Sequence, residues 1–202
     1  MAEKNEYIFS QFFFKKIRGN NYNIFNGNIF KHKQIGMKTP ILTSPFGIEK
    51  YLNKHIINIE FTNLKENNDV YNFYAKIQQI DDFFKKIKWN KNILNLVNNK
   101  IPQELINKIQ NKNYISCIRQ RANFDPLLRV HLLEKKNVYI TKFHTSSGSN
   151  IANNLFHFNN TNEKKVNKII GEFIITFGNL WITDSSYGLT LFLKSFQEHN
   201  IN

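Results

Sequence analysis

Residues 114–144, YISCIRQRANFDPLLRVHLLEKKNVYITKFH, contain the pattern that decides the expected fold of this chain. Apolar and polar residues alternate in three runs, which are Tyr114–Arg121, Leu127–Leu133 and Val138–Phe143. Such alternation is typical of strands that bury one face and expose the other. Asn-Phe-Asp-Pro at 123–126 and Glu-Lys-Lys-Asn at 134–137 are typical of turns. The stretch therefore predicts a meander of three short strands.

The polar positions of this meander hold most of the arginine in the protein. The chain has only four arginines, and Arg119, Arg121 and Arg129 lie here, with Lys142 at a further polar position. A guanidinium offers a planar fork for phosphate and a flat face for stacking on bases, which an ammonium does not. The meander is therefore predicted to bind phosphates. Asp125 could pair with Arg121 or Arg129 and make one of them structural.

Length and charge fit one domain with a polyanionic partner. The 202 residues are 41% hydrophobic, which is enough for a core, and the net charge is +13. This charge favours DNA, RNA or an anionic membrane surface, and an aromatic content of 14% favours nucleic acid. A single cysteine, Cys117, excludes an internal disulfide. No signal peptide or membrane-spanning run is recognised, so the cytosol or the nucleus is expected.

The first third of the chain is expected to supply strands. Residues 1–6 are polar and are expected to be flexible. Tyr7–Phe14 is strand-like, and Asn26-Gly27 is a hairpin signal. Met37–Gly47 contains two prolines, which predicts an extended edge segment. His55–Thr62 alternates and predicts a strand.

A helical insert at 66–112 separates these strands from the meander. Asp69–Ile87 places apolar residues at spacings of three and four, and Asn67 or Asn68 is a suitable N-cap. The insert is expected to form a helix pair, with shorter helical segments at Lys91–Val97 and Pro102–Lys108.

Strands return after a polar loop at 145–163, which is expected to be mobile. Lys165–Phe177 predicts a long strand with a bend or bulge at Gly171. A turn or loop is expected to begin at Gly178-Asn179, and Tyr187–Phe196 predicts the returning strand.

Aromatic and cationic residues interleave in this closing hairpin. Trp181 and Tyr187 lie near its turn, which favours exposure, and Phe192 shares a strand face with Lys194. Bases stack on aromatic rings at ~1–3 kcal/mol each, while cations follow the phosphates. We therefore expect Trp181, Tyr187 and Phe192 to stack bases and Lys194 to bind phosphate. Core packing is the competing role for each ring.

The order of these elements predicts a mainly β chain with a helical insert. Short strands around a mid-chain helix suit an OB-fold-like five-stranded barrel, elaborated here by N-terminal strands and an inserted helix pair. A single domain over 1–202 is expected.

Residue patterns for catalysis and for metal or cofactor binding are not found. There is no phosphate-binding glycine loop, and the six histidines and Cys117 lack zinc spacing. A metal-dependent nuclease needs clustered carboxylates, whereas Asp125 and Asp184 stand in predicted turns. We therefore expect no catalytic residues, no metal site and no cofactor.

Three stretches resemble a known family. They are Lys38-Thr39-Pro40 leading to Ser44-Pro45-Phe46-Gly47-Ile48, the INIEF strand at 57–61 before a long helix, and Lys165–Gln197. Together they resemble the single-stranded-DNA-binding proteins of large nucleocytoplasmic DNA viruses, which are similar to the replication protein of short-tailed bacteriophages. The resemblance covers roughly residues 37–197.

The resemblance implies an OB-fold protein that coats single-stranded DNA in viral replication, repair or recombination, without catalysis. It implies DNA contact by an aromatic of the closing hairpin, where Trp181 and Tyr187 fall here. It also implies a location in the host cytoplasm or nucleus, contacts with a polymerase or helicase, and self-association. The phage family recruits partners through an acidic tail, which residues 196–202 do not form.

Three other functions remain open from the sequence. RNA binding would use the same rings and cations. A DNA-packaging protein would bind through charge alone and would not prefer single strands. A nuclease would require Asp125 or Asp184 to hold a metal.

Overall fold

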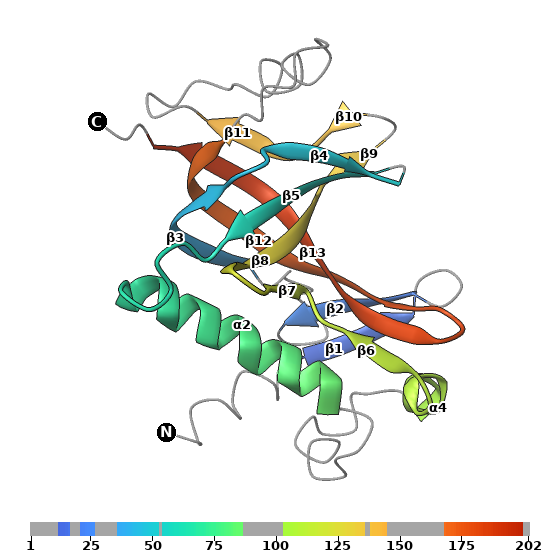
Figure 1. Ribbon diagram of the computed structural model, residues 1–202. Helices are drawn as coiled ribbons and strands as arrows, with labels where there is room; N and C mark the ends of the chain where they lie inside the picture. Colours follow the sequence, from blue (N-terminus) through green and yellow to red (C-terminus); the bar gives the residue numbers. More distant parts are fainter. Residues whose placement is uncertain are drawn as a thin grey trace. The chain divides into compact units, whose positions relative to one another are not determined.

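The computed structural model describes residues 12–16, 21–26, 36–52, 54–86, 103–135, 138–144 and 168–199 (Figure 1). Within them the chain is mainly β and has two helices, α2 (Asn68–Lys86) and α4 (Gln103–Ile109). The chain forms two compact units. The first holds the described residues within 1–35, 79–116 and 177–190, and the second holds those within 36–78, 117–176 and 191–202. The single domain over 1–202 stays a prediction.

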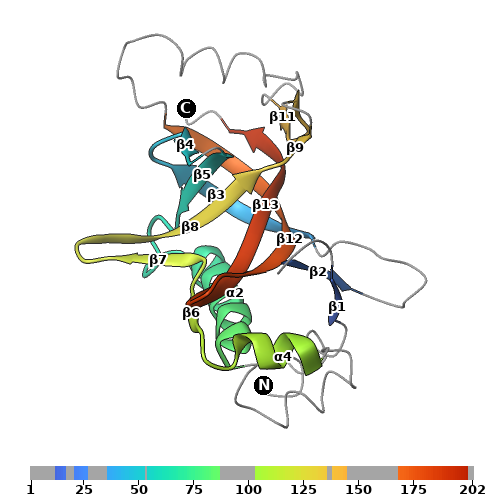
Figure 2. The ribbon, with the colours of Figure 1, turned by 90° about the vertical axis from the view of Figure 1, so that its right-hand side faces the viewer.

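Five strands pair in a closed ring, and two of them, the last two along the chain, have residues in both units (Figure 2). In ring order they are β3 (Gly36–Ser44), β5 (Lys54–Glu60), β8 (Phe124–Leu132), β13 (Ser186–Glu198) and β12 (Ile169–Ile182). The β8–β13 pair is parallel, whereas β3–β5, β5–β8 and β12–β3 are antiparallel. The prediction of a mainly β chain with a helical insert between strands is confirmed.

Short strands extend this ring. They are β4 (Ile48–Tyr51) on β5, β7 (Ile118–Arg121) on β8, and β11 (Lys142–His144) on β13. A separate ribbon joins β9 (Glu134–Lys135) to β10 (Val138–Tyr139). The third predicted strand of the meander is therefore divided between β10 and β11.

The prediction that Met37–Gly47 is an edge segment is wrong. β3 pairs with β12 on one side and with β5 on the other. Pro40 is accommodated because the β12–β3 register shifts at Phe173. There the backbone N–H of Phe173 donates to Thr39 Oγ1 at 2.9 Å. The threonine hydroxyl thus takes the place of a backbone carbonyl as the acceptor for this N–H.

Large apolar side chains fill the core of the second unit. The Phe173 and Phe196 ring centroids are 4.9 Å apart, and Phe143 packs on Phe196 at 6.3 Å. Gly171 lies against this group, where a Cβ would come within 2.0 Å of the Gln197 carbonyl oxygen. The irregularity predicted at Gly171 is a close backbone approach, and the register shift follows two residues later.

The long helix agrees with its predicted position. Asn67 caps it, because Asn67 Oδ1 accepts from the backbone N–H groups of Asp69 at 3.0 Å and Val70 at 3.2 Å. The first turns of α2 pack beside Phe61, which directly follows β5. The ring centroids of Phe61 and Tyr74 are 4.9 Å apart in an edge-to-face arrangement. α4 confirms the helix expected at Pro102–Lys108, shifted by one residue.

The first unit contains the remaining strands. β1 (Phe12–Lys16) pairs with β2 (Asn21–Asn26), which pairs in turn with the end of β12, and β6 (Asn113–Ile115) runs parallel to the start of β13. Two predictions are corrected here. The strand expected at Tyr114–Arg121 is divided into β6 and β7, in different units. The turn expected at Gly178-Asn179 is absent, because β12 continues to Ile182.

Some expectations lie outside the described residues. They are the flexible segment at 1–6, the hairpin turn at Gly27, the helix at Lys91–Val97 and the loop at 145–163.

Candidate nucleic-acid interface

One face of the sheet formed by β4, β5, β7, β8 and the adjoining part of β13 collects the arginines of the meander. Residues opposite one another on paired strands project to the same side, as do residues two apart on one strand. The register pairs Asn58 with Arg129, Leu127 with Arg119, and His131 with Phe192. We call this side the arginine face. Its polar and aromatic members include Glu49, Tyr51, Lys54, Asn58, Glu60, Arg119, Arg121, Phe124, Arg129, His131 and Phe192.

Arg129 stacks on an aromatic ring that faces solvent. Its guanidinium carbon lies 4.2 Å from the centroid of Tyr51, which is 43% exposed. This is a cation–π contact, and it leaves part of the ring open. The Arg129 Nε atom is buried and has no hydrogen-bond partner among the described residues. The guanidinium is thus held by stacking and by its strand, with hydrogen-bonding capacity unused.

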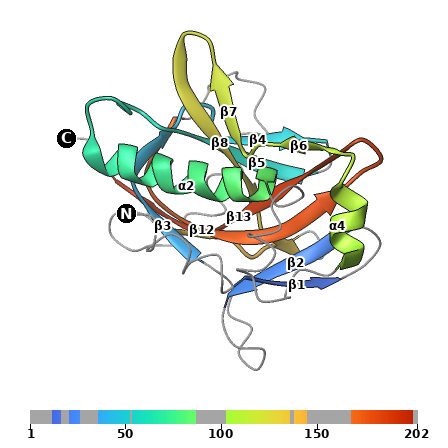
Figure 3. The same cartoon turned by 90° about the horizontal axis from the view of Figure 1, so that it is seen from below.

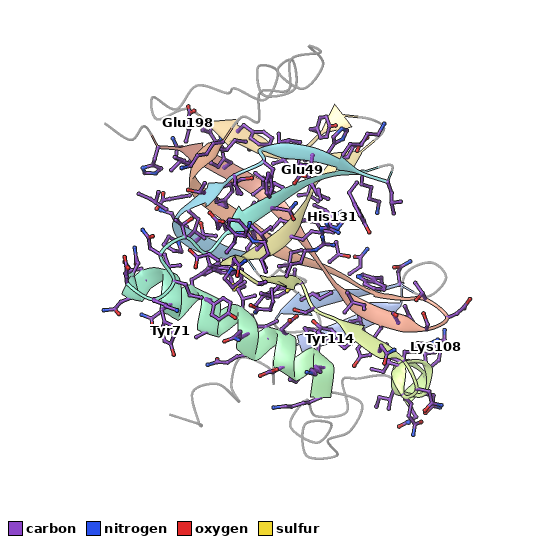
Figure 4. The ribbon with its side chains drawn as sticks, viewed as in Figure 1. Glu49, Tyr71, Lys108, Tyr114, His131 and Glu198 are labelled. Atoms are coloured by element: carbon purple, nitrogen blue, oxygen red, sulfur yellow. The ribbon has the colours of Figure 1, made fainter. Side chains whose placement is uncertain are left out.

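Arg119 lies in the same electrostatic neighbourhood. Partial burial and the nearby Arg129 guanidinium lower the pKa of Arg119, while Tyr51 and Glu49 act in the opposite direction. Neither Arg119 nor Arg129 forms an ion pair with a described residue. Glu49 on β4, labelled in Figure 4, accepts a hydrogen bond from the Asn58 amide. The two guanidinium groups therefore concentrate positive charge that is not held in an ion pair with any described carboxylate.

Arg121 has a different environment from the other two arginines. It forms an ion pair with Glu60 and donates through Nε to the Asp125 carbonyl oxygen at 2.8 Å. The Asp125 carboxylate does not form an ion pair with any of the three described arginines. It accepts from the backbone N–H of Asn63 at 3.0 Å. One of the three arginines is therefore structural, as the sequence had allowed, but its carboxylate partner is Glu60.

His131 and Phe192 lie further along the arginine face. Their ring centroids are 6.3 Å apart, edge to face, and Phe192 is half-buried. Burial, and then the charges of Lys54 and Arg129, lower the pKa of His131 to about 4. His131 is therefore neutral at neutral pH and contributes a ring rather than a charge. Phe192 keeps part of its ring accessible on the face where it was predicted.

The two predicted lysines are exposed. Lys194 is two residues beyond Phe192 on β13, and neither Lys142 nor Lys194 forms an ion pair with a described residue. Lys142 pairs with Ser195, on the side of β11 opposite to the buried Phe143. Both ammonium groups are thus available to solvent.

Trp181 and Tyr187 belong to the first unit, and the structure gives Tyr187 a core position. Tyr187 is 0% exposed, and its hydroxyl donates to the Phe84 carbonyl oxygen at 2.9 Å. Burial raises its pKa to about 12. No face of this ring is open to a base, which corrects its expected stacking role. Trp181 is half-buried, with its six-membered ring packed over Gly188.

Two aromatic residues on the arginine face were missed from the sequence. Tyr51 lies on β4, which was not predicted as a strand, and Phe124 was assigned to the Asn-Phe-Asp-Pro turn. Phe124 is 69% exposed, and the Arg121 guanidinium carbon lies 5.1 Å from its ring centroid. A proline inside an alternating run, here Pro126, was the signal for a bulge that redirects a neighbouring side chain.

Among the described residues, no three His, Cys, Asp or Glu side chains are grouped so that they could hold a metal ion. Asp81, which is 8% exposed, accepts hydrogen bonds from the Tyr114 and Ser116 hydroxyls.

Neither described helix is long and apolar enough to cross a membrane.

Comparison with known proteins finds likeness in structure but not in sequence. No family model matches the sequence, and no curated protein matches it. The chain is similar in structure to the single-stranded DNA-binding protein from bacteriophage Enc34, solved in complex with ssDNA. The identity is 9%, the likeness covers 95% of this chain and 97% of that chain, and the TM-score is 0.46. A likeness at this level carries no argument for function, and the resemblance to the viral family stays a prediction.

Proposed function

We propose that this chain is a non-catalytic, single-stranded DNA-binding protein whose arginine face holds the strand. The observation that carries the proposal is the pair of Arg119 and Arg129 beside the exposed ring of Tyr51, with neither guanidinium in an ion pair with a described residue. Single-strand binding requires cations for the phosphates and open rings for the bases, because bases are accessible for stacking only when they are unpaired.

The topology of the ring supports this assignment. Numbered along the chain, its strands are β3, β5, β8, β12 and β13, and the third is parallel to the fifth. We interpret the ring as OB-like. In OB folds the surface of the second and third strands binds oligonucleotides. Here those strands are β5 and β8, which carry Asn58, Arg129 and His131 of the arginine face.

Each side chain of the proposed interface has a defined role. Arg119 and Arg129 bind phosphates, and the exposed Lys142 and Lys194 add to the positive field. Tyr51 and Phe192 stack bases, and Trp181 remains a stacking candidate in the first unit. A role in viral replication, repair or recombination in the host cytoplasm or nucleus, self-association, and contact with a polymerase or helicase belong to the same proposal. These rest on the sequence resemblance.

Competition binding tests this function against its alternatives. A fluorescent oligo-dT is bound by the protein and displaced by unlabelled oligo-dT, by matched duplex DNA and by oligo-U. The proposal expects oligo-dT to compete far better than the duplex. Equal competition by the duplex would favour a charge-driven packaging protein, and better competition by oligo-U would favour an RNA-binding protein. Incubation with magnesium or manganese in the same experiment reports any cleavage.

A further inference from the structure

The β7–β8 hairpin presents an exposed phenyl ring. Figures 2 and 3 show this hairpin extending beyond β4 and β5. Phe124 follows directly after the hairpin turn at 122–123 and is 69% exposed. A single exposed apolar side chain is ordinary on a protein surface. What distinguishes Phe124 is how the surrounding residues direct and hold it.

A bulge directs the ring to the arginine face. Arg119 pairs with Leu127 and Arg121 pairs with Phe124, so the step of two residues on β7 is matched by a step of three on β8. In a regular strand, residues three apart such as Phe124 and Leu127 would project to opposite sides of the sheet. Pro126 lies inside this irregular segment, where its missing N–H is tolerated. The bulge therefore places Phe124 on the same side as Arg119 and Arg121.

Arg121 supports the ring from one side. Its guanidinium carbon is 5.1 Å from the Phe124 centroid, and the guanidinium is fixed by Glu60 and by the Asp125 carbonyl oxygen. These partners use its donors and compensate its charge, so Arg121 is poorly placed to bind a phosphate. The exposure of Phe124 shows that much of its ring surface remains open to solvent.

We propose that Phe124 stacks on a nucleobase, and that Arg121 acts as a positioning residue for Phe124. This inference rests on the proposed function and extends its site to the hairpin. Phe124 lies about 16 Å along β8 from Arg129, at about 3.3 Å per residue. The bound strand would thus pass Phe192, Tyr51 and Phe124 in turn along one face. A nucleic-acid ligand is favoured over a protein partner because the ring shares this face with the unpaired guanidinium groups of Arg119 and Arg129.

Substitutions at Phe124 test the stacking contact. Phe124→Ala should weaken oligo-dT binding by about 5- to 150-fold, the range for loss of one base–aromatic stack. Phe124→Tyr should restore affinity. Tyr71→Ala is the matched control, because Tyr71 is a 57% exposed aromatic on α2 and lies outside the arginine face (Figure 4). Wild-type binding that persists unchanged in Phe124→Ala would overturn this inference alone. Absence of wild-type binding would overturn the proposed function as well.

Salt dependence tests the positioning role of Arg121. If Arg121 bound a phosphate, Arg121→Gln would reduce the slope of log affinity against log salt by about 0.7. The positioning role predicts an unchanged slope with reduced affinity, and no further loss when Arg121→Gln is added to Phe124→Ala. A reduced slope, or full additivity of the two changes, would contradict it. Circular dichroism checks that the Arg121→Gln variant folds. If this variant does not fold, the Phe124 variants still test the stacking contact.

Discussion

Removal of the two unpaired arginines should change the salt dependence of DNA binding by a defined amount. Each phosphate contact on a single strand contributes about 0.7 to the slope of log affinity against log salt. Arg119→Gln and Arg129→Gln should each reduce the slope by that amount, and the double variant by about 1.4. Because neither side chain forms an ion pair with a described residue, these changes should come from lost phosphate contacts and leave existing ion pairs intact.

The slope has a direct consequence for measured affinity. Between about 50 and 200 mM salt, the wild-type protein should lose about sevenfold more affinity than the double variant, since their slopes differ by about 1.4. Fluorescence anisotropy of a labelled oligo-dT, titrated at several salt concentrations, measures both slopes. Arg129→Lys keeps the charge but not the planar stack on Tyr51, so it should keep the slope and weaken binding.

A pair of exposed lysines on or near α2 supplies the control for total charge. Lys65→Gln and Lys76→Gln together remove the same two charges outside the arginine face. They should leave the slope close to that of the wild-type protein. If this control reduces the slope as much as the arginine pair does, binding depends on total charge, and the assignment of phosphate contacts to Arg119 and Arg129 is refuted.

Three further predictions concern single side chains. Tyr51→Ala should weaken oligo-dT binding by about 1–3 kcal/mol in the same assay, while Tyr51→Phe should bind nearly as well, because a phenyl ring keeps both stacking and the cation–π contact. Tyr187→Phe should lower the free energy of unfolding in urea by about 1–2 kcal/mol through loss of the bond to Phe84, without changing DNA affinity. His131 has a folded pKa of about 4, below its ordinary value, so the unfolded state binds the proton more readily. The free energy of unfolding should therefore fall as pH decreases from about 6.5 to about 4, and His131→Gln should reduce this dependence.

Local patterns were sufficient to predict much of the fold. The helix at Asn68–Lys86 follows from apolar spacing and an N-cap, both of which are contained within a few turns of chain. The strand Lys54–Glu60 follows from alternation. A turn was predicted at Gly178-Asn179, but β12 continues there as a strand. The reason is that Asn179 pairs with Asn23 of β2, which is far away in the sequence. Pairing partners of this kind override the local preference of a Gly-Asn step.

The candidate site was only partly predictable for the same reason. The sequence identified three arginines, but it could not show that Glu60 would bind Arg121 and leave Arg119 and Arg129 without an ion pair among the described residues. A position near a turn favoured exposure of Tyr187. In the structure its hydroxyl donates to the Phe84 carbonyl oxygen of α2, and its ring centroid is 5.2 Å from that of Tyr114. Tyr51 reaches the site only through its strand register and its contact with Arg129.

Photo-crosslinking tests the location of the interface most directly. An oligo-dT in which thymines are replaced by iodouracil is irradiated on the protein, and the crosslinked residues are identified by mass spectrometry. The arginine face predicts crosslinks at Tyr51, Phe124 and Phe192, whose rings are at least partly exposed there. Crosslinks confined to residues outside this face, such as Tyr71 on α2, would contradict the proposal that the arginine face binds single-stranded DNA.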